Sequence, residues 1–103
     1  MTDRISATQF LDTVGTPDWT AADDVAAATF RTGTFEVGVR LVVAIGELAD
    51  AADHHPDVDL RYPTVTVRLS THDVGGLSHR DVELAREVSL AAAALGVSAV
   101  PAA

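Results

Sequence analysis

Three of the four histidines lie in two short segments of the chain, each flanked by carboxylates. The first segment, 53–56, contains His54 and His55, and the second, 70–73, contains His72. Imidazole can both donate and accept a proton near neutrality, because its ordinary pKa is about 6.5. A neighbouring carboxylate fixes which ring nitrogen carries the proton and stabilises the charged form. The two segments therefore predict acid–base chemistry.

Length and composition restrict the class of protein. A chain of 103 residues predicts one domain over 1–103, large enough to bury a core. The lack of cysteine excludes a disulfide framework, a zinc ribbon and a thiol nucleophile, and it fits the reducing cytoplasm, where we expect the protein. The start of the chain has no export signal and no segment is apolar enough to span a bilayer, so we expect no membrane association.

The charge pattern argues against a polyanionic partner. The formal net charge is −8, and all seven basic residues are arginines scattered along the chain. Such a surface repels phosphate backbones and anionic lipids. We therefore expect no nucleic-acid partner and a small-molecule substrate instead.

Local patterns predict the elements that position the histidines. Apolar residues at three- and four-residue steps predict helices over 35–52 and 78–95, and a capping box at Ser6 predicts a shorter helix before them. Alternation with a period of two predicts two strands within 58–70, and β-branched residues predict a strand over 25–31. This order predicts a two-layer α+β domain, in which helices cover one face of a mostly antiparallel four-stranded sheet. The chain order is β-β-α-β-β-α after the short N-terminal helix.

The helix over 35–52 is apolar on more than one face. Its main stripe consists of Val37, Leu41, Ala44, Ile45, Leu48 and Ala52. Val39, Val42 and Val43 fall outside this stripe. Surplus apolar surface of this kind predicts contact with a neighbouring subunit or another element, so we expect a homodimer or homotetramer.

The histidine segments belong to a longer pattern. Its parts are Ala52-Asp53-His54-His55-Pro56-Asp57, Tyr62, Val65, Val67, Ser70-Thr71-His72 and Gly76-Leu77-Ser78-His79-Arg80-Asp81, with Trp19, Phe30 and Phe35 upstream. On these residues the chain resembles the pterin-4a-carbinolamine dehydratases over most of its length. The resemblance implies a hydro-lyase that converts 4a-hydroxytetrahydropterin to quinonoid dihydropterin and water in the recycling of a pterin cofactor. It implies no metal and no organic cofactor.

The resemblance also implies roles for individual residues. His55 and His72 are the main acid–base pair and His54 holds the pterin, and which histidine is the acid stays open. Carboxylates orient the imidazoles or the guanidine-like edge of the pterin. The implied substrate-binding residues are Asp50, Asp53, Pro56, Thr71, Asp73, Val74 and Asp81.

Two positions depart from the pattern of that family. Asp50 stands where we expect the longer glutamate, so we expect its carboxylate to reach the substrate through a water. Val58 stands where a tryptophan is common, and it replaces an aromatic wall, worth on the order of 1 kcal/mol against a pterin ring, by an aliphatic one. The preferred pterin side chain stays open.

Other interpretations of the same residues remain. A histidine pair at a helix end can be a C-terminal cap, and Asp81 has a full explanation as the capping acid of the last helix. The histidines can also be read as metal ligands, although adjacent side chains diverge. His79 is expected on the surface and Tyr62 in the packing of the sheet. The alternative function is a non-catalytic pterin-binding or dimer-stabilising scaffold.

Overall fold

The main sheet of the computed structural model, which describes residues 3–101, is antiparallel throughout. Its order is β2-β3-β5-β4, and a short β7 pairs with the end of β3. The strands are β2 (Thr20–Ala22), β3 (Val25–Arg31), β4 (Asp57–Arg61), β5 (Thr64–Leu69) and β7 (Ser98–Ala99). The predicted fold class is confirmed, and β7 adds a fifth strand. Two residues are too few to show a periodicity, so β7 could not be predicted.

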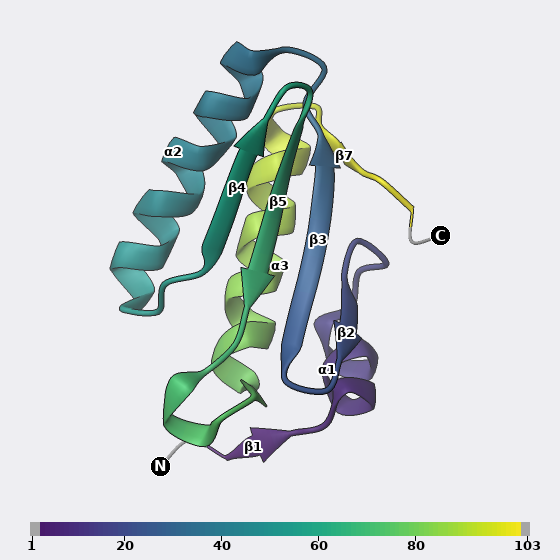
Figure 1. Ribbon diagram of the computed structural model, residues 1–103, viewed down its shortest axis with the longest axis vertical. Helices are drawn as coiled ribbons and strands as arrows, with labels where there is room; N and C mark the ends of the chain where they lie inside the picture. The colour runs from purple at the N-terminus through teal and green to yellow at the C-terminus, as the bar shows by residue number, and fades with distance from the viewer. Residues whose placement is uncertain (1–2, 102–103) are drawn as a thin grey trace.

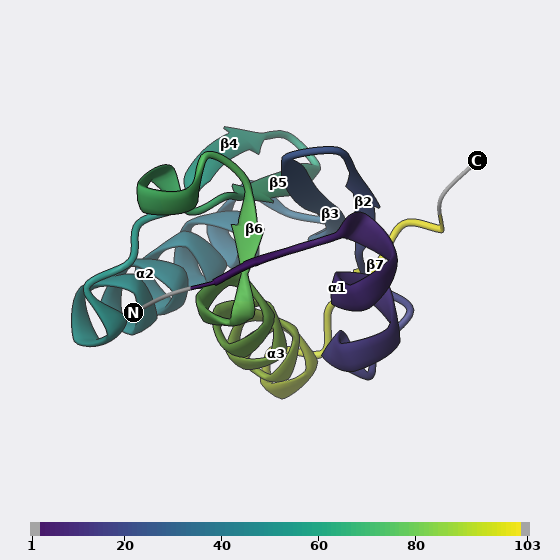
Figure 2. The same cartoon turned by 90° about the horizontal axis from the view of Figure 1, so that it is seen from below.

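Three helices cover one face of this sheet (Figure 2). They are α1 (Ala7–Val14), α2 (Phe35–Ala52) and α3 (His79–Ala94). Both predicted capping boxes form, with Gln9 in α1 and Asp81 in α3 bonding back to the N-cap residue. The helix and strand bounds therefore lie within a few residues of those that the patterns predict.

The core fills the space between the two layers. On the sheet, the alternating residues Val65, Val67 and Leu69 of β5 are buried, as period two requires. On α2 the buried residues are Gly38, Leu41, Ile45 and Ala49. The predicted stripe of α2 is only partly right, because Val37, Ala44 and Leu48 are half-buried and Ala52 is exposed.

Two aromatic or aliphatic surfaces stay outside the core. Phe35, Val39 and Val43 of α2 are 51%, 40% and 55% exposed, so the apolar surplus of this helix is not covered by another element of the described chain, residues 3–101. Tyr62 is 72% exposed, and the prediction that it packs on the sheet is wrong. It lies in the turn between β4 and β5, where strand alternation no longer applies.

A second, two-stranded sheet closes one end of the fold. In it β1 (Arg4–Ile5) pairs with β6 (Leu77–Ser78), directly before α3. Between β5 and β6 the chain makes the short 3-10 helix η1 (His72–Val74). The η1 turn and the loop after α2 lie at the same end of the molecule (Figures 1 and 2). The fold therefore brings both histidine segments to this end.

No helix within residues 3–101 combines the length and the apolar character that crossing a membrane requires.

Candidate functional site

The end of α2 turns the first histidine segment back toward α3. Asp53 caps the helix in the left-handed conformation, with φ 49°, and its N–H donates to the carbonyls of Ala49 and Asp50. The N–H of His54 also donates to the carbonyl of Ala49, at 3.1 Å. After this reversal the His54 side chain is buried against Asp81, while His55 stays exposed.

His54 forms a buried pair with Asp81. Its Nε2 lies 2.6 Å from Asp81 Oδ1, and the two side chains are 8% and 0% exposed. Nε2 of this buried imidazole is therefore occupied by the carboxylate. The contact of His54 with the pterin, which the resemblance implies, stays a prediction.

The carboxylate of Asp81 connects three parts of the chain. Its Oδ2 accepts from Thr71 Oγ1 at 2.7 Å and from the N–H of Ser78 at 3.0 Å. The Thr71 hydroxyl has one proton, which it donates to Asp81, so the Ser78 hydroxyl 2.7 Å away donates to Thr71. Asp81 therefore serves both as the capping acid of α3 and as the partner of an imidazole.

His55 forms a second pair, which is open to solvent. Its Nε2 lies 3.0 Å from Asp50 Oδ1, with the side chains 60% and 80% exposed. Although Asp50 is shorter than the expected glutamate, it reaches the imidazole directly. A pocket of about 190 Å³ lies beside this pair. Besides His55 and Asp50, its lining consists of Val42, Ile45, Gly46, Ala49, Pro56 and Val58.

His72 lies on η1, in a loop that is closed by its own backbone. The N–H of Thr71 donates to the carbonyl of Gly76 at 2.6 Å, and the N–H of Gly76 donates back at 3.3 Å. His72 and Asp73 are exposed, and Val74 is half-buried. His72 is not part of the lining of the pocket beside His55. The two exposed histidines are linked instead through their neighbours, by the bonds from Thr71 to Asp81 and from Asp81 to His54.

Asp53 and Arg80 make a contact that the sequence did not indicate. Arg80 Nη2 donates to the backbone carbonyl of Asp53 at 2.7 Å, which joins the first turn of α3 to the end of α2. Within residues 3–101 no hydrogen bond joins the Asp53 carboxylate to an imidazole. Asp53 therefore contributes its backbone to this contact, and the expected role of its carboxylate at the edge of the pterin stays a prediction. Only the position of Arg80 next to Asp81 hints at this contact in the sequence.

The fourth histidine is separate from this arrangement. His79 is exposed at the first position of α3, as predicted. Across residues 3–101 no three His, Cys, Asp or Glu side chains are grouped in a way that can hold a metal ion. His54 and His55 are instead paired with two different carboxylates.

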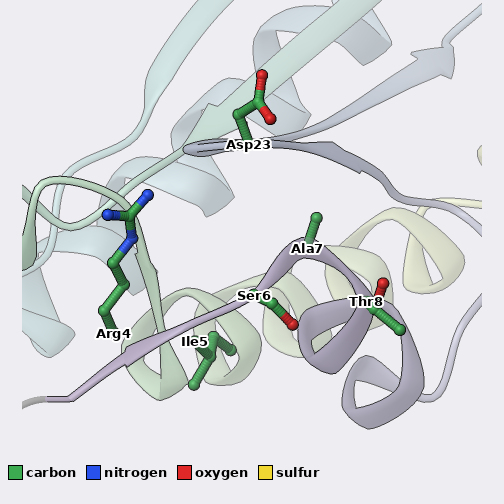
Figure 3. A pocket seen from close by; sticks show the side chains of 6 residues that line it. All are labelled: Arg4, Ile5, Ser6, Ala7, Thr8 and Asp23. Atoms are coloured by element: carbon green, nitrogen blue, oxygen red, sulfur yellow. The ribbon is translucent and has the colours of Figure 1, made fainter.

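A larger cavity lies elsewhere and has no histidine in its lining. It measures about 520 Å³ and lies where α1 begins, near the turn between β2 and β3. Figure 3 shows that its side chains spread around the cavity and do not converge on one point. They are Arg4, Ile5, Ser6, Ala7, Thr8 and Asp23. Arg4 is already paired with Asp24, so we place no chemistry in this cavity.

Comparisons with known proteins agree with the geometry. A family model described as pterin 4 alpha carbinolamine dehydratase matches residues 3–91. A relative from Nocardia farcinica is provisionally named for the same dehydratase activity. It is 46% identical over 72 residues, which cover 70% of this chain and 76% of the relative. A similarly named relative from Roseiflexus is 37% identical over 89 residues, which cover 85% of this chain and 96% of the relative.

A solved structure supports the fold. The crystal structure of a transcriptional coactivator/pterin dehydratase from Brucella melitensis superposes with a TM-score of 0.80. The match covers 87% of this chain and 99% of that one, at 22% identity. Since the family model spans most of the chain and the relatives match at well over 30% identity, the protein belongs to the pterin-4-alpha-carbinolamine dehydratase family of hydro-lyases.

Proposed function

We propose that the protein removes water from 4a-hydroxytetrahydropterin to give quinonoid dihydropterin, by histidine general acid–base catalysis in pterin recycling. The observation that carries the proposal is the solvent-open pair of His55 and Asp50 beside a pocket, in a chain of this family. The composition without cysteine fits the cytoplasmic location that we propose with it.

The reaction needs two proton transfers. The bond from C4a to its hydroxyl breaks when that oxygen is protonated, and the neighbouring ring nitrogen loses a proton as the carbon–nitrogen double bond forms. Imidazoles are suited to both steps because they exchange protons near neutral pH. Two imidazoles on different loops can serve the two positions without a metal.

The contact with Asp50 supports His55 as the base. A carboxylate accepts a hydrogen bond, so the Nε2 of His55 carries the proton in the neutral ring. Its Nδ1 then has a free lone pair that can accept the proton of the ring nitrogen, and Asp50 stabilises the imidazolium that forms. His72, on the exposed η1 turn, is the proposed acid for the leaving hydroxyl.

The buried residues position these two histidines. His54 precedes His55, and Thr71 precedes His72. The side chains of His54 and Thr71 both form hydrogen bonds with Asp81. In this proposal Asp81 holds the two loops at a constant separation. Pro56 and Asp50 border the pocket, whereas Asp73 and Val74 are placed at the substrate only by the family resemblance.

A direct assay tests the proposal. Stopped-flow absorbance on freshly generated 4a-hydroxytetrahydropterin should show faster loss of water with the protein than in buffer. The double variant His55→Ala, His72→Ala should lose this gain, because both proton transfers lack their group. His79→Ala is the matched control, since this exposed histidine lies outside the site, and it should keep the wild-type rate.

The second candidate function is a non-catalytic scaffold that binds pterin or stabilises dimers. The exposed apolar surface of α2, formed by Phe35, Val39 and Val43, favours it. A wild-type protein that gives no acceleration would support the scaffold and contradict the dehydratase. A rate gain that is present in the wild type and lost in the double variant would support the dehydratase.

A further inference from the structure

The pocket beside His55 contains a glycine in the middle of α2. Glycine in a helix interior costs roughly 0.5–1 kcal/mol of stability relative to alanine, so we expect a contact that requires it. Gly38, in the same helix, has such a contact, because a Cβ there would lie 2.8 Å from Leu60 Cδ1. A Cβ at Gly46 would meet nothing within 4 Å, and its backbone is not left-handed. Neither packing nor backbone geometry in the described chain, residues 3–101, requires this glycine.

Gly46 lies on the part of α2 that borders the pocket. It is four residues before Asp50, which places the two on one side of the helix about one turn, ~6 Å, apart. Both line the pocket of about 190 Å³, together with Val58 from β4. The open space at the missing side chain is therefore continuous with the space beside His55, the proposed base.

We propose that Gly46 is a specificity-determining residue that leaves room for the substituent on C6 of the pterin. This inference rests on the proposed function. The reacting centre is C4a and its neighbouring nitrogen, and C6 is bonded to that same nitrogen. A substrate whose nitrogen lies at His55 therefore has its C6 substituent within a few ångströms of the His55–Asp50 contact. Gly46 lies about the same distance from Asp50. Val42, Ile45 and Val58 offer aliphatic walls to the carbon chain of such a substituent.

Two variants of Gly46 test the inference with two substrates. One 4a-hydroxytetrahydropterin carries methyl on C6 and the other a three-carbon dihydroxy chain. Gly46→Leu should lower kcat/KM for the long-chain substrate at least tenfold more than for the methyl substrate. Gly46→Ala should shift the same ratio in the same direction by a smaller factor while its Tm stays equal or rises, because alanine favours helix. A structural defect would instead lower Tm and affect both substrates alike.

A matched control and two further measurements separate the possible failures. Ala51→Leu adds a similar side chain on an exposed part of α2 outside the pocket lining and should leave the substrate ratio unchanged. An unchanged ratio in Gly46→Leu would overturn the inference, and so would a changed molar mass in light scattering, which would assign Gly46 to a subunit contact. If the wild type accelerates neither substrate, the proposed function fails. Binding of the corresponding 7,8-dihydropterins then still tests Gly46, because the variant should discriminate against the longer chain in affinity.

Discussion

The buried carboxylate of Asp81 connects both histidine segments. It has no exposed surface and accepts from Thr71, from the Ser78 N–H and from the imidazole of His54. A buried acceptor with this many donors is costly to replace, because each donor would lose its partner inside the protein. At the residue scale, we therefore expect Asp81 to contribute mainly to stability and the exposed Asp50 mainly to activity.

We predict that Asp81→Asn lowers the free energy of unfolding by about 3 kcal/mol. In either orientation the amide group places an N–H against a donor of His54, Thr71 or Ser78. Urea denaturation followed by circular dichroism measures the change. Glu83→Gln, an exposed change on the same helix, is the control and should shift the free energy by less than about 0.5 kcal/mol. Equal unfolding midpoints for the two variants would contradict the prediction.

We predict that Asp50→Ala lowers the rate of the reaction but changes the stability of the protein little. The pair with His55 is largely exposed, so its loss should change stability by less than about 1 kcal/mol. The rate should fall about ten- to a hundredfold, less than the 10²–10⁴ that a general acid or base itself contributes. Stopped-flow kinetics and thermal denaturation of the same sample measure both quantities. A wild-type rate would show that Asp50 does not support His55.

At the scale of elements, the site depends on how α2 meets α3 and β4. The first turn of α3 supplies Asp81 to the side chain of His54 and Arg80 to the carbonyl of Asp53. On the other side, Gly38 allows α2 to approach Leu60 of β4 closely. The helix that carries the first histidine segment is therefore fixed at its end and along its length.

We predict that Arg80→Met loosens the loop after α2 without unfolding the protein. Methionine keeps an apolar stem but cannot donate to Asp53, and a hydrogen bond from a charged group contributes about 1.5–3 kcal/mol. Amide hydrogen exchange at 53–56 should become faster. Arg40→Met, which removes only the exposed contact with Glu36 at 3.6 Å, should leave these amides unchanged. Equal protection in both variants would rule out this role for Arg80.

The two glycines of α2 should respond differently to alanine. Gly46→Ala should stabilise the protein by roughly 0.5–1 kcal/mol, because its Cβ meets nothing within 4 Å. Gly38→Ala should stabilise it less, because the new Cβ would lie 2.8 Å from Leu60 Cδ1, the end of a side chain that must shift to make room. Chemical denaturation of both variants measures the difference. An equal gain in both variants would contradict the prediction.

At the scale of the whole molecule, the exposed apolar surface of α2 is the feature that a single chain leaves uncovered. Phe35, Val39 and Val43 recur every four residues, so they form one exposed strip along the helix. The proposed homodimer or homotetramer would bury this surface. The net charge of −8 makes association through charged surfaces unfavourable, so we expect assembly through apolar contact.

We predict that the wild type is at least a dimer and that Val39→Glu with Val43→Glu gives a smaller species. Two carboxylates in an apolar contact lose their hydration without partners, which opposes association. Multi-angle light scattering after size exclusion measures the molar mass. Leu90→Glu, at a residue that is 70% exposed on α3, is the control and should keep the wild-type mass. A monomeric wild type would remove the oligomer proposal.

The sequence by itself determined the elements and their order. The caps at Ser6 and Ser78, the bounds of α2 and the alternation in β5 depend on neighbours a few residues away, so local patterns predict them. The histidine segments were recognisable for the same reason, since their spacing within the family pattern is written along the chain. Short strands such as β7 carry too little pattern to be predicted.

Only the tertiary structure decided which carboxylate pairs with which histidine. Asp81 is 27 residues from His54 yet contacts it, whereas the adjacent Asp53 contributes only its backbone to the contact with Arg80. These pairings follow from the reversal at the end of α2 and from the approach of α3, which no local pattern encodes. The same long-range packing buries His54 and leaves His55 at the surface, because a one-residue step at a helix end changes the direction in which a side chain points.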